Sequence, residues 1–324
     1  MKSAALIIVA IASLLVLAPA HAQAPREAPA VLKTSTGNLY GTLALPVGTG
    51  PWPVALIIAG SGPTDRDGNS LIGLETDAYK LLAVALAQHG IASLRYDKRG
   101  IAASAAAGPA ESKLRFSTYV DDAVAWGKQV SADERFSALI IIGHSEGSLI
   151  GMIAAPRIPA DGYVSLAGAG EPAAKLLLTQ LKPRLPEALY RKAEHIVDQL
   201  KQGKTVADVP SSLAMLFRPS VQPYLISWFS YGPTRAIAKL RMPVLIVQGA
   251  HDLQVPVSAA RNLAKADPAA TLVLIPTMNH VLKDVGPSRD DNMAAYRNPK
   301  LPVDKGLVDS ISRFIKRVHQ PGPP

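Results

Sequence analysis

The chain carries the stretch Ala138-Leu139-Ile140-Ile141-Ile142-Gly143-His144-Ser145-Glu146-Gly147-Ser148. Its aliphatic start predicts a buried strand, and the small and apolar residues over 148–155 predict a helix directly after it. A strand, a sharp Gly-x-Ser-x-Gly turn and a helix form the setting in which a serine hydroxyl is raised above the carboxyl end of a sheet. Gly143 and Gly147 would let the strand and the helix pack closely. Ser145 is therefore the candidate nucleophile.

A serine hydroxyl is a poor nucleophile and needs a general base, which a carboxylate in turn orients. In enzymes with this kind of turn, the acid and then the histidine follow the serine along the chain. Five of the seven histidines have unsuitable positions. His21 lies in the predicted leader, His89 precedes Ser145, His144 is next to it, His195 lies in a charged helical stretch and His319 in a Pro-rich tail. Two candidates remain, His251 and His280.

Two apolar runs near the end of the chain place the acid and the base. The run over 242–249 predicts a buried strand, and Asp252 follows its carboxyl end. The run over 270–276 predicts the next strand, and His280 lies on the loop after it. Asp252 is therefore the candidate acid and His280 the candidate base, whereas His251 would face another way.

Two backbone N–H groups are expected to stabilise the oxyanion that forms during acyl transfer. One belongs to Glu146, the residue after the nucleophile. The other belongs to the loop after the predicted strand over 53–59, where Ser61 is the preferred donor and Gly62 the alternative. The Glu146 side chain has two interpretations: it binds a substrate amine, or it forms a salt bridge or cap at the start of the helix.

Several segments in a fixed order resemble the α/β-hydrolase superfamily, and specifically its bacterial carboxylesterase-like members. They are Gly60-Ser61-Gly62-Pro63-Thr64-Asp65-Arg66-Asp67-Gly68-Asn69, Arg95-Tyr96-Asp97-Lys98-Arg99-Gly100, Gly143-His144-Ser145-Glu146-Gly147, Gln248-Gly249-Ala250-His251-Asp252 and Met278-Asn279-His280. The resemblance implies a Ser-Asp-His triad and hydrolysis of esters of short acyl chains. It equally covers serine peptidases of the same fold.

Strand and helix patterns alternate over most of the chain, which predicts an α/β fold with a mostly parallel central sheet flanked by helices. We expect the first part of this core over 31–169 and the second over 240–324. The stretch over 170–239 breaks the pattern and is interpreted as an inserted helical cap. Its apolar side chains either line an acyl pocket or pack the cap onto the core, and four are named as pocket candidates (Met215, Phe217, Trp228 and Phe229).

The first residues have the features of a secretory leader. A basic residue, Lys2, precedes an apolar stretch of about 14 residues, and Ala20-His21-Ala22 provides a cleavage site. We therefore expect a signal peptide over 1–22, a linker over 23–30, and an exported protein in the periplasm or outside the cell. An uncleaved anchor is the alternative, although the apolar stretch is too short to cross a bilayer comfortably.

Composition limits the remaining function classes. The net charge is +9, but the basic residues are dispersed and no basic stripe alternates with aromatics, so nucleic acid is a poor partner. There is no cysteine, which excludes a disulfide scaffold. The expected reaction uses a small-molecule ester and needs no metal or organic cofactor. A serine aminopeptidase or amidase is the alternative, a non-catalytic binding protein is a third hypothesis, and the sequence leaves the oligomeric state open.

Overall fold

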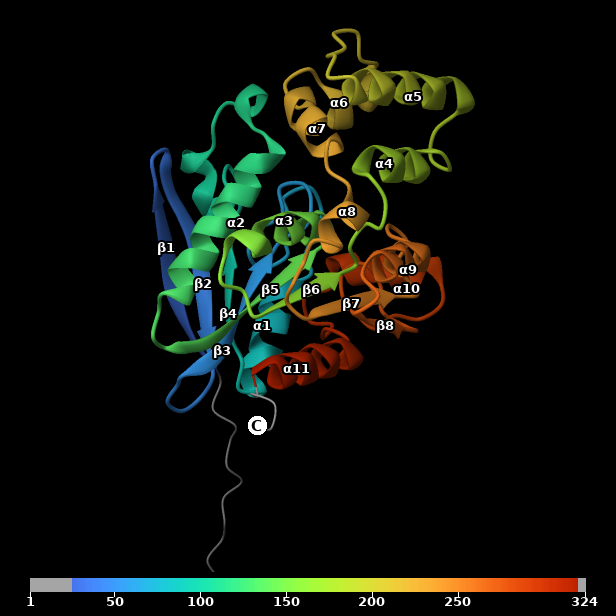
Figure 1. Cartoon of the computed structure of the whole chain (residues 1–324). Coiled ribbons are helices and arrows are strands. Elements are labelled where there is room, and N and C mark those ends of the chain that lie inside the picture. The colour runs from blue at the N-terminus through green and yellow to red at the C-terminus, as the bar shows by residue number, and fades with distance from the viewer. Residues whose placement is uncertain (1–24, 320–324) are drawn as a thin grey trace, which may run out of the picture.

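Eight strands form one sheet at the centre of the molecule (Figure 1), in a computed structural model that describes residues 25–319. The strands are β1 Arg26–Thr34, β2 Gly37–Leu45, β3 Trp52–Ile58, β4 Ala92–Tyr96, β5 Phe136–His144, β6 Gly162–Leu166, β7 Val244–Gly249 and β8 Thr271–Ile275. Their order is β1-β2-β4-β3-β5-β6-β7-β8, antiparallel from β1 to β4 and parallel from there to β8. The carboxyl ends of the parallel strands therefore meet at one edge, where sites form in such sheets.

Helices cover both faces of this sheet, which confirms the predicted α/β class (Figure 1). Helices α1 Ala78–Gln88 and α11 Lys305–His319 pack on one face. Helices α2 Phe116–Ser131, α3 Glu146–Ala154 and α9 Val257–Ala266 pack on the other. Shorter elements are α10 Arg289–Ala294 and 3₁₀ turns at Ala102–Ala107, Glu111–Lys113, Ala155–Arg157, Ser211–Leu213 and Ala295–Arg297.

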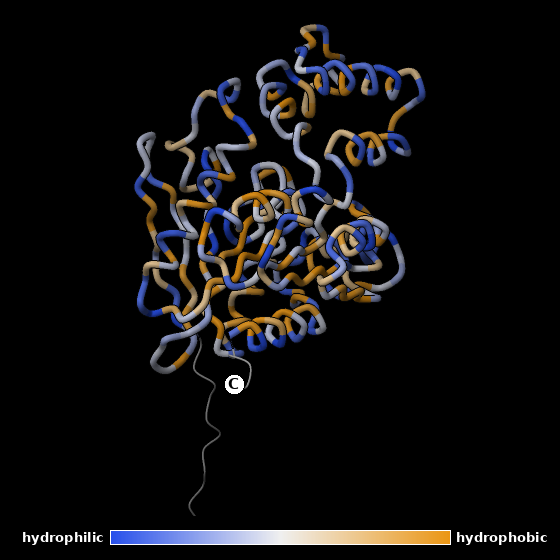
Figure 2. The backbone as a smooth tube through the Cα atoms, viewed as in Figure 1, coloured by the Kyte–Doolittle hydropathy of each residue, from blue (hydrophilic) through white to orange (hydrophobic). Residues whose placement is uncertain are grey.

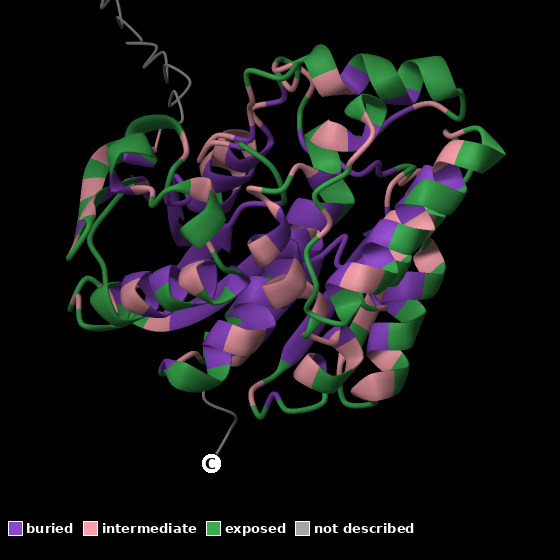
Figure 3. Ribbon diagram, turned by 90° about the horizontal axis from the view of Figure 1, so that it is seen from above, coloured by how far each residue is buried: buried purple, intermediate pink, exposed green. Residues whose placement is uncertain are grey.

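The apolar runs of the central strands are buried on both faces because successive side chains point to opposite sides. In β3, Leu56 contributes to the core under α2 and α3, whereas Ile57 contributes to the core under α1 and α11. Figure 2 shows the strands as a hydrophobic centre within more polar helices, and Figure 3 shows that the same strands are buried. This double burial explains why the strands read as continuous aliphatic runs instead of alternating ones.

The predicted linker over 23–30 is wrong from Arg26 onward, because β1 begins there and pairs with β2 from Arg26↔Leu45 to Thr34↔Gly37. Pro29 is tolerated in this strand because β1 lies at the edge of the sheet. The predicted leader over 1–22 lies outside the described residues.

The stretch between β6 and β7 is helical, as expected for a cap. It contains α4 Ala173–Leu181, α5 Glu187–Lys201, α6 Ala214–Phe217, α7 Gln222–Phe229 and α8 Pro233–Ile237. Figure 1 shows α4 to α7 above the edge formed by the strands' carboxyl ends. Within residues 25–319, no helix combines the length and the apolar character needed to cross a membrane.

Candidate active site

Ser145 occupies a strained turn between β5 and α3. Its backbone angles are φ 54° and ψ −117°, which a side chain other than glycine rarely adopts. The Ser145 N–H donates to the Leu166 carbonyl at 2.9 Å, which ties the turn to the neighbouring strand β6. A Cβ on Gly143 would lie 2.3 Å from the Gly147 carbonyl oxygen, and one on Gly147 equally close to the Ile58 carbonyl oxygen. Both glycines are thus required for the close packing that raises the serine.

Asp252 and His280 meet at the carboxyl ends of β7 and β8. His280 Nδ1 lies 2.8 Å from Asp252 Oδ2, and both side chains are buried. The other carboxylate oxygen accepts the backbone N–H groups of Gln254 at 2.7 Å and Val255 at 2.8 Å. These contacts fix the carboxylate, so it holds the imidazole in one orientation and leaves Nε2 free to act on a substrate.

The Asp252 carboxylate is stabilised in its charged form. Burial alone would raise its pKa, but His280 and the N–H donors of Val255 and Gln254 outweigh burial and lower the pKa below the usual value. Gln248 Nε2 adds a further hydrogen bond to Oδ2 at 3.0 Å. The group that faces His280 is therefore a carboxylate that can stabilise an imidazolium.

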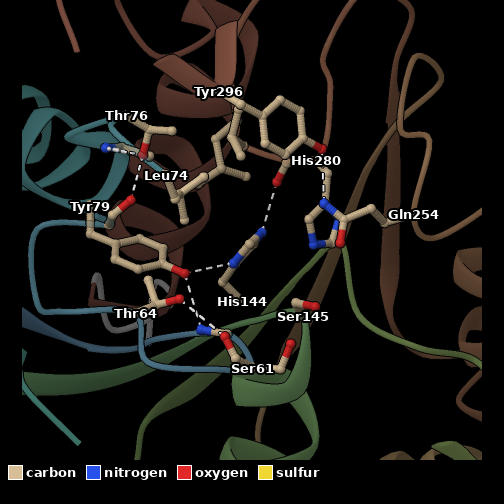
Figure 4. A pocket seen from close by; sticks show the side chains of 15 residues that line it. Ser61, Thr64, Leu74, Thr76, Tyr79, His144, Ser145, Gln254, His280 and Tyr296 are labelled. Atoms are coloured by element: carbon tan, nitrogen blue, oxygen red, sulfur yellow. Dashed lines mark hydrogen bonds between the residues drawn. The ribbon is translucent and has the colours of Figure 1, made fainter. Parts of the chain in front are cut away.

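Ser145, His280 and Ser61 line the same pocket (Figure 4), whose cavity has a volume of about 90 Å³. Within residues 25–319, no hydrogen bond joins Ser145 to His280. Such contacts are often long without substrate and shorten when one binds. The three residues predicted as nucleophile, acid and base are thus brought together at one end of the sheet.

Both predicted oxyanion donors lie beside the nucleophile. Glu146 is the first residue of α3, so its N–H has no acceptor within the helix. Ser61 lines the pocket together with Ser145, whereas the alternative donor Gly62 does not. This arrangement favours the Ser61 N–H over the Gly62 N–H as the second donor. The role of both N–H groups in binding the oxyanion stays a prediction.

His144 belongs to a hydrogen-bond chain that the sequence analysis missed (Figure 4). The Gly60 N–H donates to the Tyr79 hydroxyl oxygen at 3.0 Å, and that hydroxyl lies 2.7 Å from His144 Nδ1. His144 Nε2 lies 2.8 Å from the His280 carbonyl oxygen. A neutral imidazole with its proton on Nε2 satisfies all three contacts. The chain connects the oxyanion loop, the nucleophile turn and the loop that carries the base.

Burial keeps His144 neutral. Its pKa is lowered to about 3, first by loss of solvent and second by the nearby His280. Only its position next to Ser145 could have drawn attention to it in the sequence, because Tyr79 and the His280 carbonyl are distant along the chain. His251, in contrast, does not line the pocket, and its Nδ1 lies 3.1 Å from the Val285 carbonyl oxygen.

The Glu146 carboxylate does not line the pocket. It is buried and forms an ion pair with Lys98, with 3.2 Å between Nζ and Oε2. Its other oxygen accepts a hydrogen bond from the Tyr224 hydroxyl on α7. The side chain thus follows the salt-bridge interpretation and not the amine-binding one.

None of the four predicted cap residues lines the pocket, so their assignment to an acyl pocket is corrected. Phe217 is fully buried in the main apolar core, and Met215 is 77% exposed. Trp228 stacks on Phe116 of α2, with ring centroids 5.9 Å apart, and Phe229 packs against the same core. The Trp228–Phe116 contact thus joins α7 of the cap to α2 of the main domain.

The apolar lining of the pocket instead comes from loops. It includes Leu74 from the segment before α1, Val281 and Leu282 after the base, and Tyr296 near α10. The Tyr296 hydroxyl accepts a hydrogen bond from Gln254 Nε2 at 2.8 Å, and both side chains border the pocket. No periodic pattern marks such loop residues, so the sequence offered no signal for them.

Comparison with known proteins gives a family and a fold. Residues 73–283 match the family described as serine aminopeptidase, S33. Esterase EstD of Thermotoga maritima is 26% identical over 285 residues, which cover 87% of this chain. The chain spans 66% of that relative, slightly less than two thirds of its length.

Solved structures share the fold at low sequence identity. Est1E from Butyrivibrio proteoclasticus superposes with a TM-score of 0.58 at 16% identity, covering 91% of this chain and 99% of Est1E. Dipeptidyl peptidase 4 of Porphyromonas gingivalis superposes with a TM-score of 0.53 at 16% identity, covering 91% of this chain and 36% of the peptidase. An esterase and a peptidase thus share this architecture, which leaves the choice of reaction to the site.

Proposed function

Because the chain belongs to the serine aminopeptidase family S33 of α/β hydrolases, we propose that it is a serine esterase that cleaves carboxylic esters of short to medium acyl chains. The observation that carries this proposal is the His280–Asp252 contact at 2.8 Å in the pocket that Ser145 also lines. The similarity to an esterase from Thermotoga maritima supports the same reaction.

In the proposed mechanism, Ser145 Oγ attacks the ester carbonyl while His280 Nε2 takes the serine proton. Asp252 holds the imidazole and stabilises the imidazolium. The N–H groups of Ser61 and Glu146 bind the oxyanion of the tetrahedral intermediate. His280 then gives its proton to the leaving alcohol, an acyl-enzyme forms, and a water activated by His280 releases the carboxylic acid and restores the serine.

Aminopeptidase activity is the second candidate, because the family description names it. A free substrate amine would require an acidic group at the site. Among the described residues, no aspartate or glutamate lines the pocket, and the Glu146 carboxylate is engaged by Lys98 and Tyr224. The pocket therefore favours an ester with an uncharged acyl group.

The test is a panel of p-nitrophenyl acetate, butyrate, octanoate and palmitate beside aminoacyl p-nitroanilides, with Ser145→Ala as the control. We expect turnover of the short esters, a loss on the order of 10⁴–10⁶ in the Ser145→Ala variant, and little turnover of the anilides. Turnover mainly of the anilides would establish the peptidase instead. Absence of turnover in the folded wild-type protein would favour a binding role.

We also propose that the chain is exported, on the basis of the basic, apolar and Ala-x-Ala pattern over 1–22. Cleavage would leave a mature protein that starts near Gln23. N-terminal sequencing of the protein recovered from a producing bacterium tests this. Recovery of the chain with Met1 still in place would contradict it.

A further inference from the structure

Lys98 is a buried charged residue that the proposed mechanism does not use. It lies two residues after the end of β4 and is only 1% exposed. Its ammonium donates a short hydrogen bond to the Gly60 carbonyl and lies 3.2 Å from Glu146 Oε2. The Tyr119 ring, 5.0 Å from Nζ, covers it further. A strongly hydrated ammonium is costly to bury, so each of these contacts compensates for lost water.

The Gly60 carbonyl belongs to the same peptide group as the Ser61 N–H. A peptide group is planar and trans, so its C=O and N–H point in opposite directions. An ammonium that fixes the carbonyl on one side therefore fixes the direction of the N–H on the other. It also polarises the peptide group, which strengthens the N–H as a donor.

The second contact of Lys98 is to the residue that supplies the other expected oxyanion donor. Glu146 offers its backbone N–H at the start of α3 and its carboxylate to Lys98. One ammonium thus bridges two segments that are distant in sequence, the loop after β3 and the turn after β5. From the cap side, Tyr224 holds the same carboxylate through its hydroxyl.

We propose that Lys98 is a positioning residue of the oxyanion hole, which orients the Ser61 N–H through the Gly60 carbonyl and sets its place relative to Glu146. The proposal rests on the proposed serine-hydrolase function. An oxyanion donor acts only on charge that develops in the transition state, so its misplacement lowers kcat more than it raises KM. A purely structural lysine would not produce that selectivity.

The test compares Lys98→Met with Arg99→Met. Arg99 is the matched control because it is the adjacent residue and forms a buried ion pair with Asp122. Its guanidinium donates its other hydrogen bonds to Thr34, Thr36 and the Ala107 carbonyl, and not to Gly60. Four quantities are measured per active site: kcat, KM, the rate of inactivation by a fluorophosphonate, and inhibition by a trifluoromethyl ketone beside its methyl ketone analogue. The fluorinated ketone forms an oxyanion on the serine, whereas the methyl ketone serves as a ground-state ligand.

In Lys98→Met we expect a loss of about 10- to 100-fold in kcat, below the effect of deleting a donor altogether. KM should stay within threefold, and the affinity for the trifluoromethyl ketone should fall by the same factor as kcat, while that for the methyl ketone is kept. Arg99→Met should retain both affinities. Equal losses for both ketones, or wild-type kcat and inactivation rate in Lys98→Met, would overturn the proposal.

If Lys98→Met leaves an unpaired buried carboxylate and does not fold, the double variant Lys98→Met/Glu146→Gln removes that charge and carries the same expected outcomes. The wild-type protein separates this inference from the function on which it rests. A wild type without Ser145-dependent labelling by the fluorophosphonate refutes the serine-hydrolase function. A labelled wild type with an equally reactive Lys98→Met variant refutes only the role of Lys98.

Discussion

His280 Nδ1 and Asp252 Oδ2 lie 2.8 Å apart, although 28 residues separate them in the chain. The backbone N–H groups of Gln254 and Val255 hold the Asp252 carboxylate in place independently of its contact with the imidazole. Its orientation is thus independent of substrate, and the histidine tautomer follows from it. This relationship determines the first prediction.

Asp252→Asn should lower kcat by about 10⁴ with little change in KM, because an amide can donate to Nδ1 and favour the wrong tautomer. Steady-state kinetics on p-nitrophenyl acetate measures the effect. The buried amide of Asn is close in size to the carboxylate, so the variant should fold. A decrease in kcat of less than tenfold would show that Asp252 does not orient the base.

The fold and the reactive residues were predictable because their signals are local. The aliphatic run into Ser145 marks a strand and a turn. Asp252 follows the buried strand β7, and His280 follows the partly exposed edge strand β8. Parallel strands bring such ends together whatever their distance in sequence. The order of Ser145, Asp252 and His280 along the chain was therefore enough to assign their roles, without knowledge of their contacts.

The lining of the pocket and the hydrogen-bond chain through Tyr79 and His144 could not be predicted, because they depend on contacts between loops that are distant in the sequence. Leu74 and Tyr296 meet at the pocket although more than 200 positions separate them in the chain, and neither lies in a periodic pattern. The cap aromatics were misassigned for the opposite reason. An apolar pattern shows that Trp228 is buried, but not whether its neighbour is a ligand or Phe116.

A second prediction concerns Tyr79, whose hydroxyl joins Gly60 to His144. Tyr79→Phe removes the acceptor of a buried N–H and the partner of His144 Nδ1, so the free energy of unfolding should fall by about 1–3 kcal/mol. It should also reduce kcat about tenfold, because the Ala59–Gly60 peptide, which leads directly into the Gly60–Ser61 peptide, loses its hydrogen bond to Tyr79. Urea unfolding and steady-state kinetics measure the two effects.

Tyr163→Phe is the matched control for Tyr79→Phe. Tyr163 is an equally buried tyrosine whose hydroxyl donates to the Ser148 carbonyl, away from the oxyanion loop. It should lose stability to a similar extent and keep its kcat. An equal decrease of kcat in both variants would show that any buried tyrosine hydroxyl has this effect.

A third prediction follows from the buried His144. Its pKa is about 3 in the folded protein against 6.5 for an ordinary histidine, so between these values the unfolded chain binds a proton that the folded chain does not. The contribution of neutral His144 to the stability of the folded protein is therefore fully present above pH 6.5, and it is lost as the pH falls toward 3. The slope contributed by one such group approaches about 1.4 kcal/mol per pH unit.

Urea unfolding at pH values from 7 to 4 measures this dependence, and His144→Gln is the comparison because it removes only this titration. The wild-type protein should lose stability more steeply than His144→Gln below pH 6.5, although it should be the more stable of the two at pH 7. Parallel curves would mean that His144 takes up its proton while the protein is folded.

The fourth prediction concerns acyl-chain preference and separates the two interpretations of the pocket. Leu74 lines the pocket beside Tyr296, so Leu74→Ala should make room for longer acyl chains and raise kcat/KM for octanoate relative to acetate about tenfold. Met215→Ala should leave that ratio unchanged because Met215 is exposed, and Trp228→Ala should mainly destabilise the protein because it leaves Phe116 without its stacking partner. A shift in Trp228→Ala with none in Leu74→Ala would return the acyl pocket to the cap.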